Sequence, residues 1–380
     1  MPDASAPLPP GPRPGGAGAL VFATLVLCSA FGEVSTGLLV PALPGLAELF
    51  GATPAATQLT LVAFAVAFAA GQLLFGPLSD RRGRRRALVI GAALTLAASL
   101  AAALAGDLAT IVAARTVQGF GAAAGYVVAR AMVRDLYGAE GAAKAMALLF
   151  ALMSACFLLA PLLGGLLLEL AGWRSGFAAA ALAAAAWLAS ALLVMPETAA
   201  PRHGPGAEAV HRVYLGLFRH RGFLAHMLAH ALAYAALYCF VAGAPFLLIE
   251  GRGLAPARYG ALAALAMSGF LAGALAARAV IPRLGRGRTV AVSLAIMLAA
   301  PAALVGAGLL GLAATPAVTA LEFAVWFGGG LLAPNTASGV MAAHPKAAGA
   351  AAAMLGFMQM LAAAGAASVQ GLIYDGTVFP

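Results

Sequence analysis

Charged side chains are scarce in this chain: Asp, Glu, Lys and Arg make up 9% of the 380 residues, and hydrophobic residues make up 63%. Soluble domains carry about 25% charged residues, because their surface must be wetted. The shortage of charge therefore excludes a water-soluble protein and predicts one that is dissolved in lipid, with its backbone groups bonded within helices. In a membrane protein the net charge of +9 reflects basic residues in the loops on one side of the membrane, and it does not indicate nucleic-acid binding.

Cysteine and catalytic patterns are also scarce. Cys28, Cys156 and Cys239 all lie inside apolar runs, which excludes a disulfide framework or a metal site with the usual spacing. No Gly-x-x-x-x-Gly-Lys-Ser/Thr loop is present, so an ATP-driven pump is excluded. Neither a Ser/His/Asp nor a Cys/His constellation indicates an enzyme. We expect a protein without catalytic activity, metal or cofactor, in which active transport would use an ion gradient.

Long apolar runs dominate what is present. A spanning helix needs about 20 apolar residues, and eleven runs qualify. They cover approximately residues 17–42, 55–78, 87–105, 108–130, 142–168, 174–195, 222–250, 257–281, 289–312, 316–341 and 347–373.

The runs divide the chain into two parts. We expect a disordered Pro- and Gly-rich tail at 1–16 without a signal peptide, a six-helix half at 17–198, a cytoplasmic linker at 199–221 and a five-helix half at 222–380. Two similar six-helix halves would need a twelfth helix. Either the sequence is a fragment, or its second half is incomplete.

The basic residues predict the orientation, because cytoplasmic loops carry an excess of Lys and Arg. With the N-terminus inside, only Arg174, Arg252 and Arg258 fall outside and Arg115 falls within a helix, so the other eighteen of the 22 basic residues are cytoplasmic. We therefore expect a cytoplasmic N-terminus.

The cluster "GPLSDRRGRRR", residues 76 to 86, forms the turn between the second and third runs. We expect Gly76 to let two helices approach closely and Gly83 to allow a tight turn. Asp80 can face a helix N-terminus and pair with guanidinium groups. The alternative for the neighbouring arginines Arg82, Arg85 and Arg86 is that they only keep this loop on the cytoplasmic side of the membrane.

This loop resembles the Gly-x-Leu-x-Asp-Arg-x-Gly-Arg-Arg signature of the major facilitator superfamily. "QLTLVAFAVAFAAGQLLFGPLSD", "RAMVRDLYGAEGAAKAMA", "APLLGG" and "PNTASG" are similar to the Bcr/CflA subfamily of drug:proton antiporters. The resemblance implies an all-α membrane protein with the major facilitator fold of two pseudo-symmetric helical bundles. It also implies that the loop is a conformational latch, with Gly76, Asp80, Arg81, Gly83 and Arg84 matching position by position.

Two further stretches carry the resemblance. Pro161, Gly164 and Gly165 in "APLLGGLL" are similar to the antiporter helix motif of drug exporters, although Ala160 stands where the generic pattern has glycine. An ordinary small-residue helix contact is the alternative. Arg115 and Gln118 resemble the family's Arg-x-x-Gln-Gly motif, which is implicated in proton transfer. Snorkelling of Arg115 to the outer interface is the alternative there.

Two acids, Glu33 and Glu322, lie clearly within apolar runs, which makes them candidates for proton carriage. The subfamily's helix-one acid would fall at Gly37 and its tyrosine at Leu39, and both are absent. Glu33 lies one helical turn before Gly37 on the same face, so it can supply a displaced carboxylate. The alternative for either acid is a hydrogen-bonded group with no coupling role. Glu322 matches no known family position.

Other polar residues are less informative. His226 and His230 are four residues apart and can in principle titrate or bind a metal, but no third ligand is evident. We expect them at the cytoplasmic interface.

The resemblance implies a monomeric, proton-coupled multidrug exporter of the chloramphenicol and bicyclomycin resistance type, in the bacterial inner membrane. Its partners would be drug-like compounds, protons and lipid. A major facilitator transporter of a metabolite such as a sugar or amino acid, and a non-transporting truncated member, are the alternatives.

Overall fold

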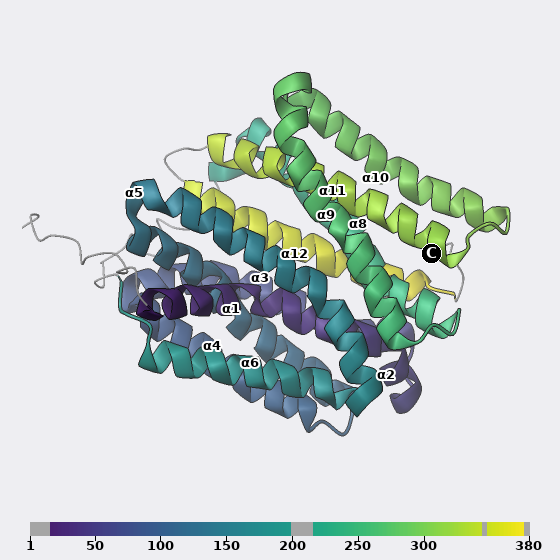
Figure 1. Ribbon diagram of the computed structural model, residues 1–380, viewed down its shortest axis with the longest axis horizontal. Coiled ribbons are helices and arrows are strands. Elements are labelled where there is room, and N and C mark those ends of the chain that lie inside the picture. Colours follow the sequence, from purple (N-terminus) through teal and green to yellow (C-terminus); the bar gives the residue numbers. More distant parts are fainter. Residues whose placement is uncertain (1–15, 199–215, 344–347, 376–380) are drawn as a thin grey trace, which may run out of the picture.

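A computed structural model describes residues 16–198, 216–343 and 348–375, and every regular element in these ranges is a helix (Figure 1). Eleven helices in the described ranges are long and apolar enough to cross a membrane, which confirms the predicted number. The first half contains α1 (Gly16–Leu39), α2 (Leu43–Phe50), α3 (Pro54–Arg82), α4 (Arg84–Ala103), α5 (Leu108–Ala171) and α6 (Arg174–Leu193). The second contains α8 (Arg221–Pro245), α9 (Pro256–Leu284), α10 (Arg286–Leu309), α11 (Thr315–Ala343) and α12 (Ala348–Ile373).

Two expected segments lie almost wholly outside the described residues. These are the N-terminal tail and most of the linker between the halves, residues 1–15 and 199–215.

Proline and glycine account for two differences from the expected helix boundaries. The first apolar run does not continue as one helix to residue 42, because Pro41 lies in the short 3₁₀ turn Val40–Ala42, after which α2 begins. A proline lacks the amide that would continue the helix. The fourth and fifth spans form the single element α5, bent at Gly138, whose φ is +63°. Glycine tolerates this left-handed conformation without a Cβ clash.

The helices lie roughly side by side, so the molecule has two ends (Figure 1). We call the end that carries residues 80–86 the arginine end. The opposite end, which carries Gly51, Gly172 and Gly251, we call the far end. In Figure 1 the first half, purple to teal, lies mostly below the second half, green to yellow.

Contacts at the far end join the two halves. Nε2 of Gln58 in α3 donates to Oε1 of Gln370 in α12 at 2.5 Å and to the carbonyl of Ala242 in α8 at 3.1 Å. The backbone amide of Ala257 in α9 donates to Oε1 of Glu169 in α5 at 2.8 Å. One buried apolar cluster contains residues of both halves, among them Leu61 of α3 and Ala242 of α8. The far end is therefore closed in this structure.

The two halves differ in how well their third spans are covered. In α4 the most apolar 18-residue window is 44% buried, whereas the corresponding window of α10 is 22% buried. Helix α6 packs along α4, and the described part of the second half contains no helix in the equivalent place. One flank of α10 is therefore uncovered.

Candidate functional site

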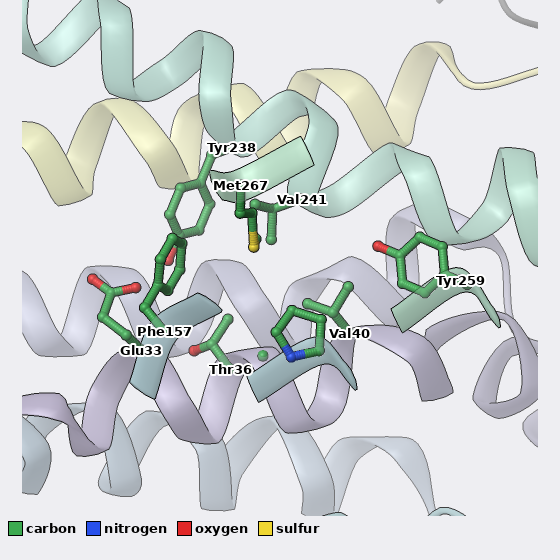
Figure 2. Close-up of a pocket in the computed structure, with 10 residues that line it drawn as sticks. Glu33, Thr36, Val40, Phe157, Tyr238, Val241, Tyr259 and Met267 are labelled. Atoms are coloured by element: carbon green, nitrogen blue, oxygen red, sulfur yellow. The ribbon is translucent and has the colours of Figure 1, made fainter. Parts of the chain in front are cut away.

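A small cavity lies between the two halves (Figure 2). Its volume is about 20 Å³, which is room for roughly one water molecule, so this cavity holds nothing larger in the present structure. Residues of α1, of the 3₁₀ turn Val40–Ala42 and of α5 face residues of α8 and α9 across it. The lining residues are Glu33, Thr36, Gly37, Val40, Phe157 and Pro161 from the first half and Tyr238, Val241, Tyr259 and Met267 from the second.

Glu33 is the acid in this cavity. Its carboxyl and the side chain of Thr36, one helical turn further along α1, both line the cavity, and Tyr238 reaches them from α8 (Figure 2). Glu33 interacts electrostatically with Arg130 of α5 and with Tyr238. A carboxyl at the junction of the halves, near one cation, can exchange a proton or a cationic ligand.

Arg130 is a site residue that the sequence reasoning missed, because it was counted with the cytoplasmic arginines. Its guanidinium lies 3.6 Å from the ring centre of Tyr126 and 5.0 Å from that of Phe150. Such contacts with aromatic faces stabilise a cation. The spacing in "GYVVARAMVRD" was the available signal, since Arg130 follows Tyr126 by one helical turn and faces the same side.

Arg115 points inward and does not snorkel to an interface. It is fully buried, and its Nη2 donates to Oγ1 of Thr36 at 3.0 Å and its Nη1 to Oε1 of Gln118 at 2.5 Å. Nε donates to the carbonyl of Thr60 at 3.3 Å, and the guanidinium lies 4.0 Å from the ring centre of Phe64. The buried cation therefore has the partners that it needs.

These bonds continue away from the cavity. Nε2 of Gln118 donates to Oγ of Ser99 at 2.7 Å, and that hydroxyl donates to the carbonyl of Thr95 at 2.7 Å. Thr36, Arg115, Gln118 and Ser99 thus form one polar chain that starts at the cavity wall beside Glu33.

Pro161, Gly164 and Gly165 lie where α5 meets both α1 and α9. Pro161 lines the cavity. A Cβ added to Gly164 would lie 2.7 Å from the carbonyl oxygen of Leu38 in α1. A Cβ added to Gly165 would overlap the carbonyl oxygen of Pro256, which begins α9. The two glycines therefore allow backbone contact within the first half and between the halves.

Two of the departures from the family pattern, Gly37 and Ala160, lie against one another. A Cβ added to Gly37, where the subfamily's acid would fall, would lie 2.5 Å from Cβ of Ala160. Contacts below 3.0 Å do not occur between real side chains without a shift. A longer side chain at position 37 has no room beside Ala160, whereas Glu33 lines the same cavity one turn earlier.

The arginine loop is tied to α5. Nη1 of Arg84 lies 2.5 Å from Oδ1 of Asp80, and its Nε donates to Oδ2 of Asp135 in α5 at 3.2 Å. Nη1 also donates to Oγ of Ser79 at 2.7 Å, and Thr198 donates to the same Asp135 oxygen at 3.1 Å. These partners of Asp80 and Arg84 all belong to the first half. Asp135 was missed because nothing in sequence spacing pairs it with a loop 51 residues earlier.

Glu197, which follows α6, supplies the helix cap that Asp80 was expected to provide. Its carboxylate accepts from the backbone amides of Arg84 and Arg85, the first residues of α4, at 2.7 and 3.2 Å. Acids are favourable at helix N-termini because of the exposed amides and the helix dipole. Gly83 has φ +96°, which confirms the expected tight turn, and an added Cβ there would overlap Glu197.

The expected role of Gly76 is not supported. A Cβ added to it would lie 3.8 Å from Cγ1 of Val127, which is an ordinary contact. No close helix approach requires glycine at this position in the structure.

One of the two histidines of α8 is placed differently from the expectation. His230 is buried, not interfacial: Nδ1 lies 2.8 Å from Oγ1 of Thr336 and Nε2 lies 3.0 Å from Oε1 of Gln359. Its position on the inward face of α8 explains the difference. Nδ1 of His226 lies 2.7 Å from the carbonyl of Gly222. Within the described ranges, no group of three His, Cys, Asp or Glu side chains is placed to bind a metal.

Comparisons with known proteins agree with this architecture. The sequence profile of the Major Facilitator Superfamily matches residues 25–367. The chain is 29% identical over 356 residues to Multidrug resistance protein D of Escherichia coli strain K12, covering 92% of the chain and 88% of that protein. The crystal structure of a D-xylose-proton symporter has the same fold, with a TM-score of 0.74 at 17% identity, covering 93% of this chain and 90% of that one.

Two further relatives match over shorter stretches. An uncharacterized MFS-type transporter of Bacillus subtilis is 30% identical over 242 residues, 63% of this chain and 60% of that protein. The chloramphenicol resistance protein of Pseudomonas aeruginosa is 36% identical over 184 residues, 47% and 44% of the two chains. In these two matches the chain covers less than two thirds of the relative.

The predicted resemblance is thus confirmed on independent grounds, the helical architecture and the matched sequences. The fold and the relatives are those of transporters that span the membrane many times. The chain belongs to the Major Facilitator Superfamily and is related to its Bcr/CflA-type drug antiporters.

Proposed function

We propose that this protein is a proton-coupled exporter that exchanges inward-moving protons for outward-moving hydrophobic drugs across the bacterial inner membrane. The observation that carries the proposal is the carboxyl of Glu33, which lines a cavity formed by both halves. The names of the relatives, which include multidrug and chloramphenicol resistance proteins, support drugs as the substrates.

Glu33 would couple the two fluxes by competition for one site. A cavity that opens to alternate sides can load Glu33 with a proton from outside and release it inside. A drug that occupies the cavity displaces the proton, so the two ligands are never bound together. Each is therefore carried in a separate step, the proton inward and the drug outward. Arg130, which interacts with the carboxyl, would serve as its counter-charge when the proton has left. Arg115 and Gln118 would position Thr36 beside Glu33. A change in the charge of Glu33 would then alter the hydrogen bonds of Thr36, Arg115 and Gln118 in the first half.

The conformational parts follow from the family resemblance and, for the seam between α5 and α9, also from the close backbone contact there. The halves, residues 17–198 and 222–380, would rock about the cavity with 199–221 as the linker. Pro161, Gly164 and Gly165 would form the seam that closes the far end, and Gly76, Asp80, Arg81, Gly83 and Arg84 would latch the arginine end. The excess of arginine at that end supports its placement in the cytoplasm, together with the N-terminus. The protein would act as a monomer.

The test is a drug-susceptibility panel in a bacterial host that lacks its own exporters, with and without a protonophore. The wild-type chain should raise the inhibitory concentration of several hydrophobic drugs, and the protonophore should remove this effect. Glu33→Gln should abolish the protection while leaving protein level and drug binding intact. Glu48→Gln, which changes an exposed acid of α2, is the matched control and should behave as wild type.

Protection that persists in the Glu33→Gln variant would remove Glu33 from the coupling mechanism. A chain that protects against no drug but accumulates or exports a labelled sugar or amino acid would replace drug efflux by metabolite transport.

A further inference from the structure

A second cavity lies at the arginine end of the second half, away from the site described above. Its volume is about 200 Å³, against about 20 Å³ for the central cavity. Such a space has room for several water molecules or a small polar group. Three helices form its walls, and the lining residues are Ala225, His226 and Ala229 of α8, Arg286, Gly287 and Val290 of α10, and Asn335 and Thr336 of α11.

The first turn of α10, in the wall of this cavity, lacks the anionic cap that the equivalent helix of the first half has. Helix α4 begins after Gly83, and the carboxylate of Glu197 accepts from its first two backbone amides. Helix α10 begins after Gly285 and has no acid in its first turn. Within the described ranges, no side chain accepts from its first amides. Exposed amides and the helix dipole favour an anion at this position.

Two side chains that line the cavity also lack partners among the described residues. The guanidinium of Arg286 forms no hydrogen bond or ion pair with them. Asn335 is 3% exposed, and its Oδ1 is buried without a hydrogen bond, whereas its Nδ2 donates to the carbonyl of Leu331 at 3.4 Å. A buried acceptor without a donor is costly. The cavity therefore offers a positive charge with free donors, and one acceptor that needs a donor.

No acid in the described part of the second half lies at this end to balance the charge of Arg286. Glu250 and Asp375 are at the far end, and Glu322 lies within α11. Arg288, in the same first turn of α10, adds a further positive charge. The matching ligand is therefore an anion that also carries a hydrogen-bond donor.

The surroundings of the cavity indicate a lipid as the source of that anion. In the first half, α6 packs along both α1 and α4. The described part of the second half has no helix in the equivalent place along α8 and α10, which are two walls of the cavity. Helix α10 lies at the edge of the molecule (Figure 1), and its Leu298 and Leu309 are well exposed. Apolar chains can lie along this flank while a polar group enters the cavity.

We infer that this cavity binds the headgroup of an anionic phospholipid that has a free headgroup hydroxyl, such as phosphatidylglycerol. The phosphate takes the position at the start of α10 that Glu197 takes at the start of α4, beside the guanidinium of Arg286. The headgroup hydroxyl donates to Oδ1 of Asn335. The acyl chains cover the exposed flank of α10. The site is separate from Glu33 and does not depend on the proposed function.

Native mass spectrometry of the purified full-length chain, released from equal amounts of phosphatidylglycerol and phosphatidylcholine, tests the inference. Wild type should retain one phosphatidylglycerol in preference to phosphatidylcholine. Arg286→Gln should weaken its retention by about tenfold or more, because a hydrogen bond to a charged group is lost. Arg288→Gln is the matched control, since it removes the same charge from the same turn but does not line the cavity. It should change retention by no more than about twofold.

A second pair of variants tests the space itself. A Cβ added to Gly287 meets no atom within 4 Å, so Gly287→Leu can fill the cavity without displacing its walls and should prevent lipid binding. Gly306→Leu, at an equally open position on the same helix, is the matched control and should bind the lipid as wild type does.

The role of Asn335 is tested by two lipids in one variant, so that a general loss of folding is recognised. Phosphatidylmethanol has the same charge as phosphatidylglycerol but no headgroup hydroxyl. Asn335→Leu should weaken phosphatidylglycerol several-fold and leave phosphatidylmethanol almost unchanged, because only the first lipid can donate to Oδ1.

The inference is overturned if wild type retains the two lipids equally, if Arg286→Gln and Arg288→Gln have equal effects, or if Gly287→Leu binds phosphatidylglycerol normally. Displacement of the lipid by millimolar inorganic phosphate, in a manner that depends on Arg286, would assign the cavity to a free phosphate instead. None of these measurements requires transport, so failure of the proposed function would leave their results unchanged.

Discussion

Replacing Gly165 by alanine should shift the protein away from the state in which the far end is closed. An added Cβ would overlap the carbonyl oxygen of Pro256 and would lie 2.9 Å from Cα of Ala257, whereas ordinary contacts begin at 3.4 Å. Every atom in the way belongs to the backbone of the other half, so no side chain can rotate aside. Separation of α5 from α9 is the remaining way to relieve the overlap.

The size of the shift follows from the cost of overpacking, which is about 1–3 kcal/mol for an extra methyl group in a close-packed site. This cost applies only while α5 and α9 touch. It therefore raises the free energy of the state with the closed far end and leaves that of the open state unchanged. A bias of that size corresponds to a change of about 5- to 150-fold in the ratio of the two states.

The assay is a distance measurement between two spin labels at the far end, in protein whose three cysteines are replaced by alanine. Labels at Leu170, at the end of α5, and at Leu312, between α10 and α11, are suitable because both side chains are well exposed. The long-distance population should grow in Gly165→Ala. Gly365→Ala is the matched control, because nothing lies near its added Cβ, and it should leave the distances unchanged.

Gly164→Ala provides a second comparison. Its added Cβ would overlap Leu38 within the same half, so it should lower the thermal stability more than it shifts the distances. A distance distribution of Gly165→Ala identical to that of wild type would refute the assignment of this contact as the closing seam.

The remaining predictions concern the loops. Asp80→Asn and Asp135→Asn should each slow drug export in proteoliposomes without changing which compounds are recognised, and a changed substrate range would contradict the latch. Because both acids share Arg84, the stability losses of the two single variants should not be additive, and the loss in the double variant should differ from their sum by about 0.5 kcal/mol or more. Hydrogen bonds from the backbone amide and hydroxyl of Thr110 lower the pKa of Asp107. The stabilisation from this cap is therefore present above the unfolded pKa of about 3.9 and is lost as pH falls through the lower folded value. Thermal unfolding followed across that acidic range should show a decline in wild type that is smaller in Asp107→Asn.

The positions of the helices were predictable because each apolar run is long and is bounded by polar or glycine-containing turns. The turn at Gly83 was predictable for the same local reason, since one residue type meets the conformational need. The continuation of the chain from Val40 into a separate helix was missed, although Pro41 was visible. The backbone beyond a proline depends on what the next helix packs against, and local sequence does not determine that.

Long-range pairs were not predictable for a different reason. The helices are apolar on nearly all sides, so periodicity does not indicate which face packs inward. That is why Arg130 was assigned to the surface and His230 to the interface. The contacts of Asp135 and Glu197 with the arginine loop, and of Gln58 with Gln370, join residues distant in sequence. Their pairing depends on the tertiary arrangement alone.

The backbone contact of Gly165 with Pro256 also has a mechanical consequence. While that contact holds, α9 can tilt relative to α5 about a point near the far end of both helices. Helix α9, which begins at Pro256, has 29 residues and so spans about 43 Å, and a tilt of about 10° over that length displaces its opposite end by about 7.5 Å. A gap wide enough for a planar aromatic molecule can thus open without unfolding any helix. Glycine at the contact lets the two backbones touch, so the point of rotation lies close to one end of the helices. A small rotation there produces a large displacement at the other end.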